Sequence, residues 1–239
     1  MLPVLPFFLK LVRRRGFGGR HGRSIRAGEV AVILLRMLGL VIPVKMLDST
    51  KMRLSGSLDP DQRRRLTLAM LADVLRATEH ITQRIVVTKD PDAEAVAIAN
   101  GCTICVDPGV GLNGALDSAG ILAMSIQIDR LLVIPSDVPT VTGSDLDELI
   151  NANAEVVIAR SKDGGTNGLL RSPADVIPAM FGPQSATAHA HEAARLGVSA
   201  VRLDLPSLAN DIDDMAGLAE LAALDDGTQS SRFARSILS

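Results

Sequence analysis

The chain has 239 residues, of which 47% are hydrophobic and 22% charged, and its formal net charge is −2. This balance is typical of a soluble globular protein and excludes a disordered or collagen-like chain. Two cysteines cannot supply a disulfide framework, which favours a reducing compartment, and we expect the protein to be cytoplasmic. With no Trp, no Tyr and five Phe, the sequence lacks the aromatic platforms that bind single-stranded nucleic acid.

Residues 1–36 differ from the rest of the chain in charge. They carry eight Lys or Arg against one acid, Glu29, so residues 37–239 have a net charge of −9. The apolar stretch 2–9 precedes the arginine run 13–15, which reverses the order of a signal peptide, and it is too short to span a bilayer. We interpret 1–36 as a basic extension that is disordered or dispensable, interpret 37–239 as the functional domain, and expect no membrane partner.

From Met37 onward, short β-branched runs alternate with segments of helical periodicity. Asp59 and Pro60 supply an N-cap and a first-turn proline for the first expected helix. Strands are expected at 38–44, 84–88, 102–106, 130–134, 155–160 and 198–203, and helices at 60–75, 91–100, 112–126, 144–152, 185–196 and 214–224. Residues 161–168 are expected to form a polar loop and 225–239 a frayed tail. Because the strands are mostly continuous apolar runs, we predict an α/β fold with a mostly parallel central sheet covered by helices on both faces.

A glycine-rich turn follows the third expected strand. Gly109, Gly111 and Gly114 form a G-x-G-x-x-G pattern before a helix, and Asp137 follows at the distance of the dinucleotide-binding fingerprint. The pattern stands after the third strand rather than the first, however, and Pro108 interrupts the junction. Three interpretations stay open: a tight turn that begins a helix, a nicotinamide site, and a contact with another nucleotide.

Three cations follow the first expected strand, namely Lys45, Lys51 and Arg53. Ligands of parallel α/β sheets bind beyond the carboxyl ends of the strands. Lys offers a point charge and Arg a planar fork, and both suit the oxygens of a polyphosphate. In a domain that is otherwise acidic, this loop is where we expect a triphosphate; the other interpretation is a solvated loop.

Carboxylates occur near the ends of two later strands. Asp137 stands between Pro135 and Pro139, and Asp211 and Asp213 stand in the segment 210–214. Mg²⁺ takes oxygen ligands, commonly one or two carboxylates with phosphate and water, so acids converging from distant segments would suit it. Taken singly, each acid also fits a helix N-cap or a solvated turn.

Six motifs then occur in a fixed order along the chain. They are Pro43-Val44-Lys45 with Lys51-x-Arg53-Leu54, Asp107-x-Gly109-x-Gly111-Leu112-Asn113-x-Ala115-Leu116, Pro135-x-Asp137-x-Pro139, Gly165-Thr166-Asn167, Phe181-Gly182-Pro183-x-Ser185, and Asp211-Ile212-Asp213. Together they resemble the guanylyltransferases that make the phospholactyl or phosphoenolpyruvyl guanosine diphosphate precursor of coenzyme F-420. The resemblance covers essentially all of 37–239.

This resemblance implies a three-layer, nucleotide-diphospho-sugar-transferase-like (Rossmann-like) fold. It implies transfer of GMP from GTP to phosphoenolpyruvate or 2-phospho-L-lactate, with release of pyrophosphate and Mg²⁺ as cofactor. It also implies roles for individual residues: Asp137, Asp211 and Asp213 hold the metal; Lys45, Lys51 and Arg53 face the triphosphate; Gly111 and Asn113 contact the nucleotide; Thr166, Gly182 and Ser185 bind the phosphorylated three-carbon acid; and Lys45, Lys51 and Asp137 are catalytic.

The segment 213–218 reads Asp-Asp-Met-Ala-Gly-Leu, where relatives usually have Asp-Thr-Pro-Glu-Asp-Leu. This departure leaves open which of Asp211 and Asp213 binds metal. Two other functions stay open: a nucleotidyltransferase of the same fold acting on a sugar phosphate or molybdopterin, and a non-catalytic GTP-binding module. The sequence does not choose the acceptor acid, and it leaves open whether the protein forms a homodimer.

Overall fold

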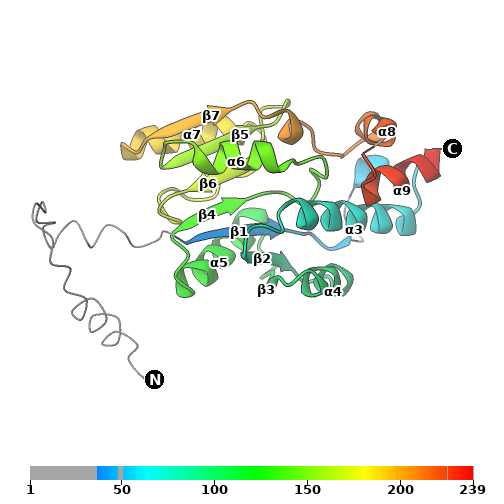
Figure 1. The fold of residues 1–239 in the computed structure, drawn as a ribbon, viewed down its shortest axis with the longest axis horizontal. Helices are drawn as coiled ribbons and strands as arrows, with labels where there is room; N and C mark the ends of the chain where they lie inside the picture. Colours follow the sequence, from blue (N-terminus) through cyan, green and yellow to red (C-terminus); the bar gives the residue numbers. More distant parts are fainter. Residues whose placement is uncertain (1–36, 48–50, 225, 239) are drawn as a thin grey trace, which may run out of the picture. The chain divides into compact units, whose positions relative to one another are not determined.

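The computed structural model describes residues 37–47, 51–224 and 226–238 (Figure 1). The prediction that residues 1–36 are a dispensable extension lies outside the described residues. The strands are β1 (Leu38–Pro43), β2 (Gln83–Thr88), β3 (Thr103–Val106), β4 (Arg130–Val133), β5 (Val156–Arg160), β6 (Thr166–Arg171) and β7 (Ala200–Leu203). The α-helices are α3 (Pro60–Ala77), α4 (Pro91–Ala99), α5 (Leu112–Ser125), α6 (Gly143–Asn151), α7 (Ser185–Leu196), α8 (Met215–Ala223) and α9 (Gln229–Leu238), and short 3-10 helices are η2 (Met52–Leu54) and η3 (Pro206–Leu208).

The described strands form one seven-stranded sheet in the order β3-β2-β1-β4-β6-β5-β7. Strands β3, β2, β1 and β4 pair in parallel, and β5 pairs in parallel with β7, whereas β6 runs antiparallel to both β4 and β5. The carboxyl ends of β1 and β4 therefore meet at one edge of the sheet, where the parallel arrangement places ligands. The predicted mostly parallel α/β architecture is confirmed.

Helices cover both faces of the sheet because successive strand residues point to opposite sides. On β1, Leu40 and Ile42 pack in a cluster with α3, α4, α6 and η3, whereas Val41 packs in a second cluster with α5 and α7. All three side chains are fully buried. This pattern explains why the strands are apolar without alternation and gives the fold its three layers.

Strand β6 was not expected, because its first residues lie in the segment 161–168 that the sequence predicts as a polar loop. Thr166, Asn167 and Arg171 are buried, with 4–6% of their surface exposed. The Asn167 amide donates to the carbonyl of Leu208 at 3.0 Å, and the Arg171 guanidinium donates to the carbonyl of Ile177 at 3.0 Å. These bonds give both side chains a backbone partner inside the protein, although the Nε of Arg171 has none, so the strand forms despite its polar residues.

A second correction concerns the C-terminus. The frayed tail predicted for 225–239 is wrong for 229–238, which form α9, and Ser230, Ser231 and Ala234 on this helix are fully buried. Helices α8 and α9 lie together beside α3 (Figure 1). Among the helices of the described ranges, none is long and apolar enough to cross a membrane.

Candidate active site

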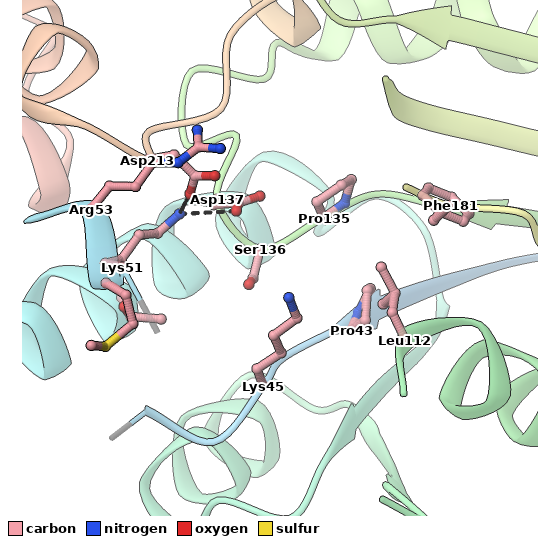
Figure 2. Close-up of a pocket in the computed structure, with 12 residues that line it drawn as sticks. Pro43, Lys45, Lys51, Arg53, Leu112, Pro135, Ser136, Asp137, Phe181 and Asp213 are labelled. Carbon is pink, nitrogen blue, oxygen red and sulfur yellow. Dashed lines mark hydrogen bonds and ion pairs between the residues drawn. The ribbon is translucent and has the colours of Figure 1, made fainter. Parts of the chain in front are cut away.

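The cationic loop after β1 and the acids after β4 and β7 meet in one hollow of about 340 Å³ (Figure 2). Its lining consists of Pro43, Lys45, Lys51, Met52, Arg53, Thr67, Leu112, Pro135, Ser136, Asp137, Phe181 and Asp213. The structure thus brings together the three cations and two of the three acids that the sequence singled out. Two cations, Lys45 and Arg53, are exposed at this hollow, so their charges are available to a ligand.

Lys51 links the two acidic segments. Its ammonium donates to Oδ2 of Asp137 at 2.9 Å and to Oδ1 of Asp213 at 2.5 Å. Burial lowers the pKa of Lys51, but the charges and hydrogen bonds of the two carboxylates outweigh burial and raise it. The ammonium therefore stays charged at neutral pH, and the lysine offsets the repulsion between the two acids.

The backbone of Lys51 is in the left-handed region, with φ of +53°. This conformation costs about 1–2 kcal/mol for a residue other than glycine. The strain is maintained by the interactions around the residue, which is only 9% exposed. Such strain occurs at sites where a side chain must be aimed, and here it directs the ammonium at the acids.

Asp137, Asp211 and Asp213 can each place one carboxylate oxygen within 4.8 Å of the others. Burial, with the charges of Asp137 and Asp213, raises the pKa of Asp211 to about 6. Burial also opposes ionisation of Asp213, but Lys51 outweighs it and lowers the pKa of Asp213. Three clustered carboxylates are the oxygen donors that Mg²⁺ prefers, and their mutual repulsion is what a divalent cation relieves, so these residues fit such an ion.

The glycine-rich turn lines a second hollow of about 230 Å³, which shares Pro43, Lys45 and Leu112 with the first. Gly111 stands at the N-cap of α5 with φ of +91°, a conformation that glycine adopts without steric cost. Lys89, Asp107 and Gly109 also line this hollow, so a ligand that extends from the first hollow past the shared residues would reach the turn.

Asn113 uses its side chain within the protein. Its amide N–H donates to the carbonyl of Phe181 at 3.1 Å, and its amide oxygen accepts from the Phe181 N–H at 2.8 Å. The side chain thus fixes Phe181, a residue of the first hollow, to the start of α5.

The residues predicted to bind the acceptor acid are linked by hydrogen bonds, since the Ser185 N–H donates to the carbonyl of Gly182 at 3.1 Å. The hydroxyls of Thr166 and Ser185 are 3.0 Å apart, and both residues are buried, whereas Gly182 is exposed with φ of +145°. Among the described residues, the lining of the first hollow includes Phe181 but not these three.

His189 supports this pair and has no role in the sequence-based prediction. Its Nε2 accepts from the Met180 N–H at 2.9 Å, so its Nδ1 carries the proton and donates to the Thr166 hydroxyl at 3.2 Å. Burial and the charge of Arg171 lower the pKa of His189 to about 4, which keeps the ring neutral. Only the tertiary contacts reveal this residue, because nothing in the sequence of α7 distinguishes His189 from the exposed His191 two residues later.

Other contributors to the first hollow were also not predicted as site residues. Ser136 and Phe181 stand inside two of the motifs, next to Asp137 and Gly182, and this adjacency is the signal that could have found them. Met52 could have been found by the same signal, because it stands between Lys51 and Arg53 in the sequence. Thr67 has no such signal, because it lies in the middle of α3 and reaches the hollow only through the fold.

The chain matches a known protein family over most of its length. The model of the family described as "Guanylyl transferase CofC like" matches residues 38–238. The chain belongs to this family. The predicted identification as a guanylyltransferase family member, and hence as a nucleotidyltransferase enzyme, is confirmed.

Named members of the family are similar over most of their length. A phosphoenolpyruvate guanylyltransferase of Roseiflexus castenholzii is 38% identical, and the match covers 83% of this chain and 94% of that protein. A 2-phospho-L-lactate guanylyltransferase of Methanothermobacter thermautotrophicus is 33% identical, covering 82% and 89%. A crystal structure described as a nucleotide-diphospho-sugar transferase of Desulfovibrio desulfuricans shares the fold, with a TM-score of 0.69 and 17% identity over 84% of this chain and 95% of that one.

Proposed function

We propose that this family member transfers GMP from GTP to phosphoenolpyruvate and releases pyrophosphate, as a step of coenzyme F-420 biosynthesis. The observation that carries the proposal is the joint placement of Lys51, Asp137 and Asp213 beside the exposed Lys45 and Arg53 in one hollow. Phosphoenolpyruvate is the preferred acceptor because the relatives that are 36–38% identical are named for it.

The reaction needs no covalent enzyme intermediate. An oxygen of the acceptor phosphate, which is largely ionised at neutral pH, forms a bond to the α-phosphorus of GTP. The bond from that phosphorus to the bridging oxygen breaks, and pyrophosphate leaves with the electron pair. Because both reactants are anionic, catalysis consists of bringing them into line and neutralising their charge.

The cations of the hollow supply part of this neutralisation. Lys45 and Arg53 are exposed to the ligand, so we assign them to the triphosphate, with Lys45 at the charge that develops on the leaving pyrophosphate. Lys51 is held by Asp137 and Asp213 and so adds its charge at the junction between the two acidic segments.

Asp137, Asp211 and Asp213 would hold Mg²⁺, which when bound acts as a Lewis acid on phosphate oxygens and as a template for the nucleotide. The carboxylates must be ionised to bind a cation. Lys51 contributes to this because it lowers the pKa of Asp213.

We assign the nucleoside to the second hollow, next to the glycine-rich turn. The carboxylate of Asp107 lines this hollow, and its Oδ1 already accepts from the Gly109 N–H at 2.8 Å. A carboxylate has further acceptor positions, and guanine offers two adjacent donors, N1–H and N2–H. Asp107 is therefore a residue that would distinguish guanine, which donates at N1, from adenine, which accepts there.

For the three-carbon acid we assign Thr166, Gly182 and Ser185. Because His189 donates to the Thr166 hydroxyl, the Thr166–Ser185 pair has two hydroxyl protons and uses one between its members. One proton is left to donate to an anionic oxygen, which suits a phosphate or carboxylate acceptor. The open space where a Cβ would stand at Gly182 allows the acceptor to approach its backbone.

We also propose a cytoplasmic location. Cys102 and Cys105, the two cysteines of the chain, are both free thiols. Free thiols fit a reducing compartment.

The test is pyrophosphate release by the purified full-length chain with GTP and Mg²⁺, offering phosphoenolpyruvate, 2-phospho-L-lactate and 3-phosphoglycerate separately. CTP in place of GTP, and reactions without metal, are the controls. We expect release with GTP and phosphoenolpyruvate. Release with another of the three acids would correct the acceptor. GTP binding without release in all reactions would overturn these three acids as acceptors, in favour of a different acceptor, such as a sugar phosphate or molybdopterin, or of a non-catalytic GTP-binding module.

A further inference from the structure

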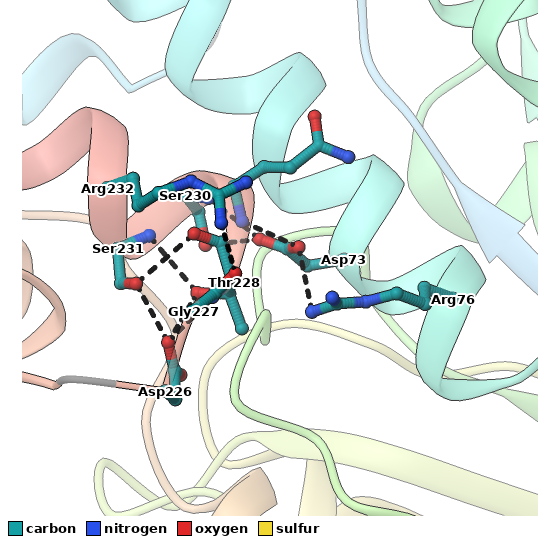
Figure 3. Close-up of polar contacts among 9 residues, drawn as sticks. Asp73, Arg76, Asp226, Gly227, Thr228, Ser230, Ser231 and Arg232 are labelled. Atoms are coloured by element: carbon teal, nitrogen blue, oxygen red, sulfur yellow. Dashed lines mark hydrogen bonds and ion pairs between the residues drawn. The ribbon is translucent and has the colours of Figure 1, made fainter.

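Asp73, in the C-terminal part of α3, forms hydrogen bonds to the first turn of α9 (Figure 3). It is 2% exposed. Its Oδ1 accepts from the Gln229 N–H at 2.9 Å, and its Oδ2 accepts from the N–H and the hydroxyl of Ser230 at 2.8 and 2.7 Å. Arg76 pairs with the same carboxylate at 3.3 Å. The charge therefore satisfies amide groups that a helix N-terminus leaves without partners, and it interacts favourably with the helix dipole.

Helix α9, fixed in this way, closes a third hydrophobic cluster that is separate from the two clusters on the faces of the sheet. Ala234 is fully buried in this third cluster, and Phe233 and Ile237 pack against it. The cluster also contains residues of α3 and α8, together with Leu54 and Ile212. The packing of α9 thus reaches residues far from the C-terminus in the sequence.

Two members of the third cluster, Leu54 and Ile212, stand in the sequence next to residues of the candidate active site. Leu54 directly follows the cationic segment 51–53 and is fully buried. Ile212 stands inside the acidic segment 211–213, is 3% exposed, and donates its N–H to the carbonyl of Asp137 at 3.0 Å. The same apolar contacts therefore anchor both segments whose charges meet in the hollow.

We propose that Asp73 is a positioning residue for the active site, because it fixes α9 and α9 in turn holds the segments 51–53 and 211–213 at the separation that cation binding needs. This inference rests on the proposed function in that it takes Asp137, Asp211 and Asp213 as the metal ligands. Asp73 itself touches neither the ligands nor the hollow, and acts through packing alone.

Both segments need such an anchor because their local interactions oppose the arrangement. The acidic segment brings the carboxylates of Asp211 and Asp213 to that of Asp137, with oxygens within 4.8 Å of one another, and like charges this close repel. The cationic segment contains the left-handed backbone of Lys51. Packing of Leu54 and Ile212 against one closed cluster offsets these costs, as a supporting shell does for a precise site.

The test uses full-length protein and Mn²⁺ alone, an ion that accepts the same oxygen ligands as Mg²⁺. We expect Asp73→Ala to weaken Mn²⁺ binding, measured by calorimetry, about tenfold or more, as loss of a supporting partner does at metal sites. Asp73→Asn keeps one carbonyl oxygen as an acceptor and should fall between the alanine variant and the wild type. Asp61→Asn, the same change at an exposed position of α3, should bind Mn²⁺ as the wild type does.

Amide hydrogen exchange of Ile212 gives a readout that needs neither metal nor turnover. We expect Asp73→Ala to accelerate exchange at Ile212, whose N–H bonds to Asp137, while amides of β1 and β4 keep their protection. Equal acceleration in the strands would show a role in overall stability only and would overturn the inference. The inference would also be overturned if Asp73→Ala changed neither the affinity for Mn²⁺ nor the exchange rate at Ile212.

If Asp73→Ala does not fold, Asp73→Asn and Ser230→Ala decide by the same measurements, since Ser230→Ala removes one of the three bonds to α9. Failure of the proposed function is distinguishable from failure of this inference. If the wild type shows no guanylyl transfer, the proposed function is refuted. If Asp73→Ala still accelerates exchange at Ile212, the positioning role of Asp73 is retained.

Discussion

The ammonium of Lys51 lies 2.9 Å from Oδ2 of Asp137, although 86 residues separate the two along the chain. One residue follows β1 and the other follows β4, and these strands are hydrogen-bonded neighbours in the sheet. Parallel pairing of two central strands thus places a cation and an acid at the same sheet edge. This pair is the point at which the loop that we propose to bind the nucleotide joins the acids that we propose to bind the metal.

Asp137→Asn removes a carboxylate that faces both Lys51 and the proposed metal. We expect kcat to fall by about 100-fold or more, on the scale of losing one electrostatic contact to a transition state, while the fold is kept because the side chains have the same shape. Pyrophosphate release and circular dichroism measure the two effects. Asp129→Asn, at an exposed position before β4, is the matched control. Near-normal turnover in Asp137→Asn would refute the metal role.

Asp211 and Asp213 are expected to differ when each is replaced by Asn. Both changes should raise the Mg²⁺ concentration for half-maximal activity, but Asp213→Asn should also lower kcat, because it removes a partner of Lys51 at 2.5 Å. Asp214→Asn is the control, since Asp214 caps α8 through the Gly217 N–H and Asn caps equally well. Identical behaviour of all three variants in a Mg²⁺ titration would contradict the assignment.

Asp107 is expected to select the base. Asp107→Asn should raise KM for GTP and narrow the preference for GTP over ATP by about ten- to a hundredfold, because a good bidentate contact to a base is worth about 1–3 kcal/mol. The ratio of kcat/KM for the two nucleotides measures this. An Asp107→Asn variant with the wild-type ratio would place base recognition elsewhere.

The lowered pKa of His189 is expected to make the free energy of unfolding depend on pH. Its pKa is lowered by burial to about 4 in the folded chain, from an ordinary value of 6.5. Between these values the unfolded chain binds a proton that the folded chain does not, so the free energy of unfolding increases with pH. The stabilisation is complete above about pH 6.5 and is lost as the pH falls toward 4.

Urea unfolding of the wild type and His189→Gln between pH 4 and 8 tests this dependence. We expect the variant to be less stable at pH 8, because two hydrogen bonds are altered, and to depend less on pH. His191→Gln, at an exposed position two residues later, should follow the wild type. A His189→Gln curve parallel to the wild-type curve would contradict the prediction.

Deletion of residues 1–36 is expected to leave folding and guanylyl transfer intact. The family match begins at residue 38, and each site residue named here lies beyond that point. Thermal unfolding and pyrophosphate release by a chain that starts at Met37 provide the measurements. An insoluble or inactive product would show that the basic segment is needed.

The order of strands and helices was predictable because apolar periodicity is a local property. The N-cap of α3 is one example: Asp59 accepts from the Gln62 N–H, as the Asp-Pro sequence predicted. The structure adds the reciprocal bond, in which Gln62 accepts from the Asp59 N–H. The placement of the loop cations beside Asp137 was likewise predictable, because residues after parallel strands share one sheet edge. Asp211 and Asp213 follow β7, at the far end of the sheet, and only the course of the chain after η3 brings them there.

By itself, the sequence determined the fold class and the family, and it singled out Lys51, Asp137 and Asp213, which the structure brings together in one hollow. The tertiary structure decided that the polar segment after β5 pairs as β6, that 229–238 fold back as α9, and that His189 lies under Thr166. These features rest on buried polar groups, and a polar residue is predicted as exposed until its partner is known. Those partners, such as Asp73 for α9, are distant in sequence and meet only in the folded chain.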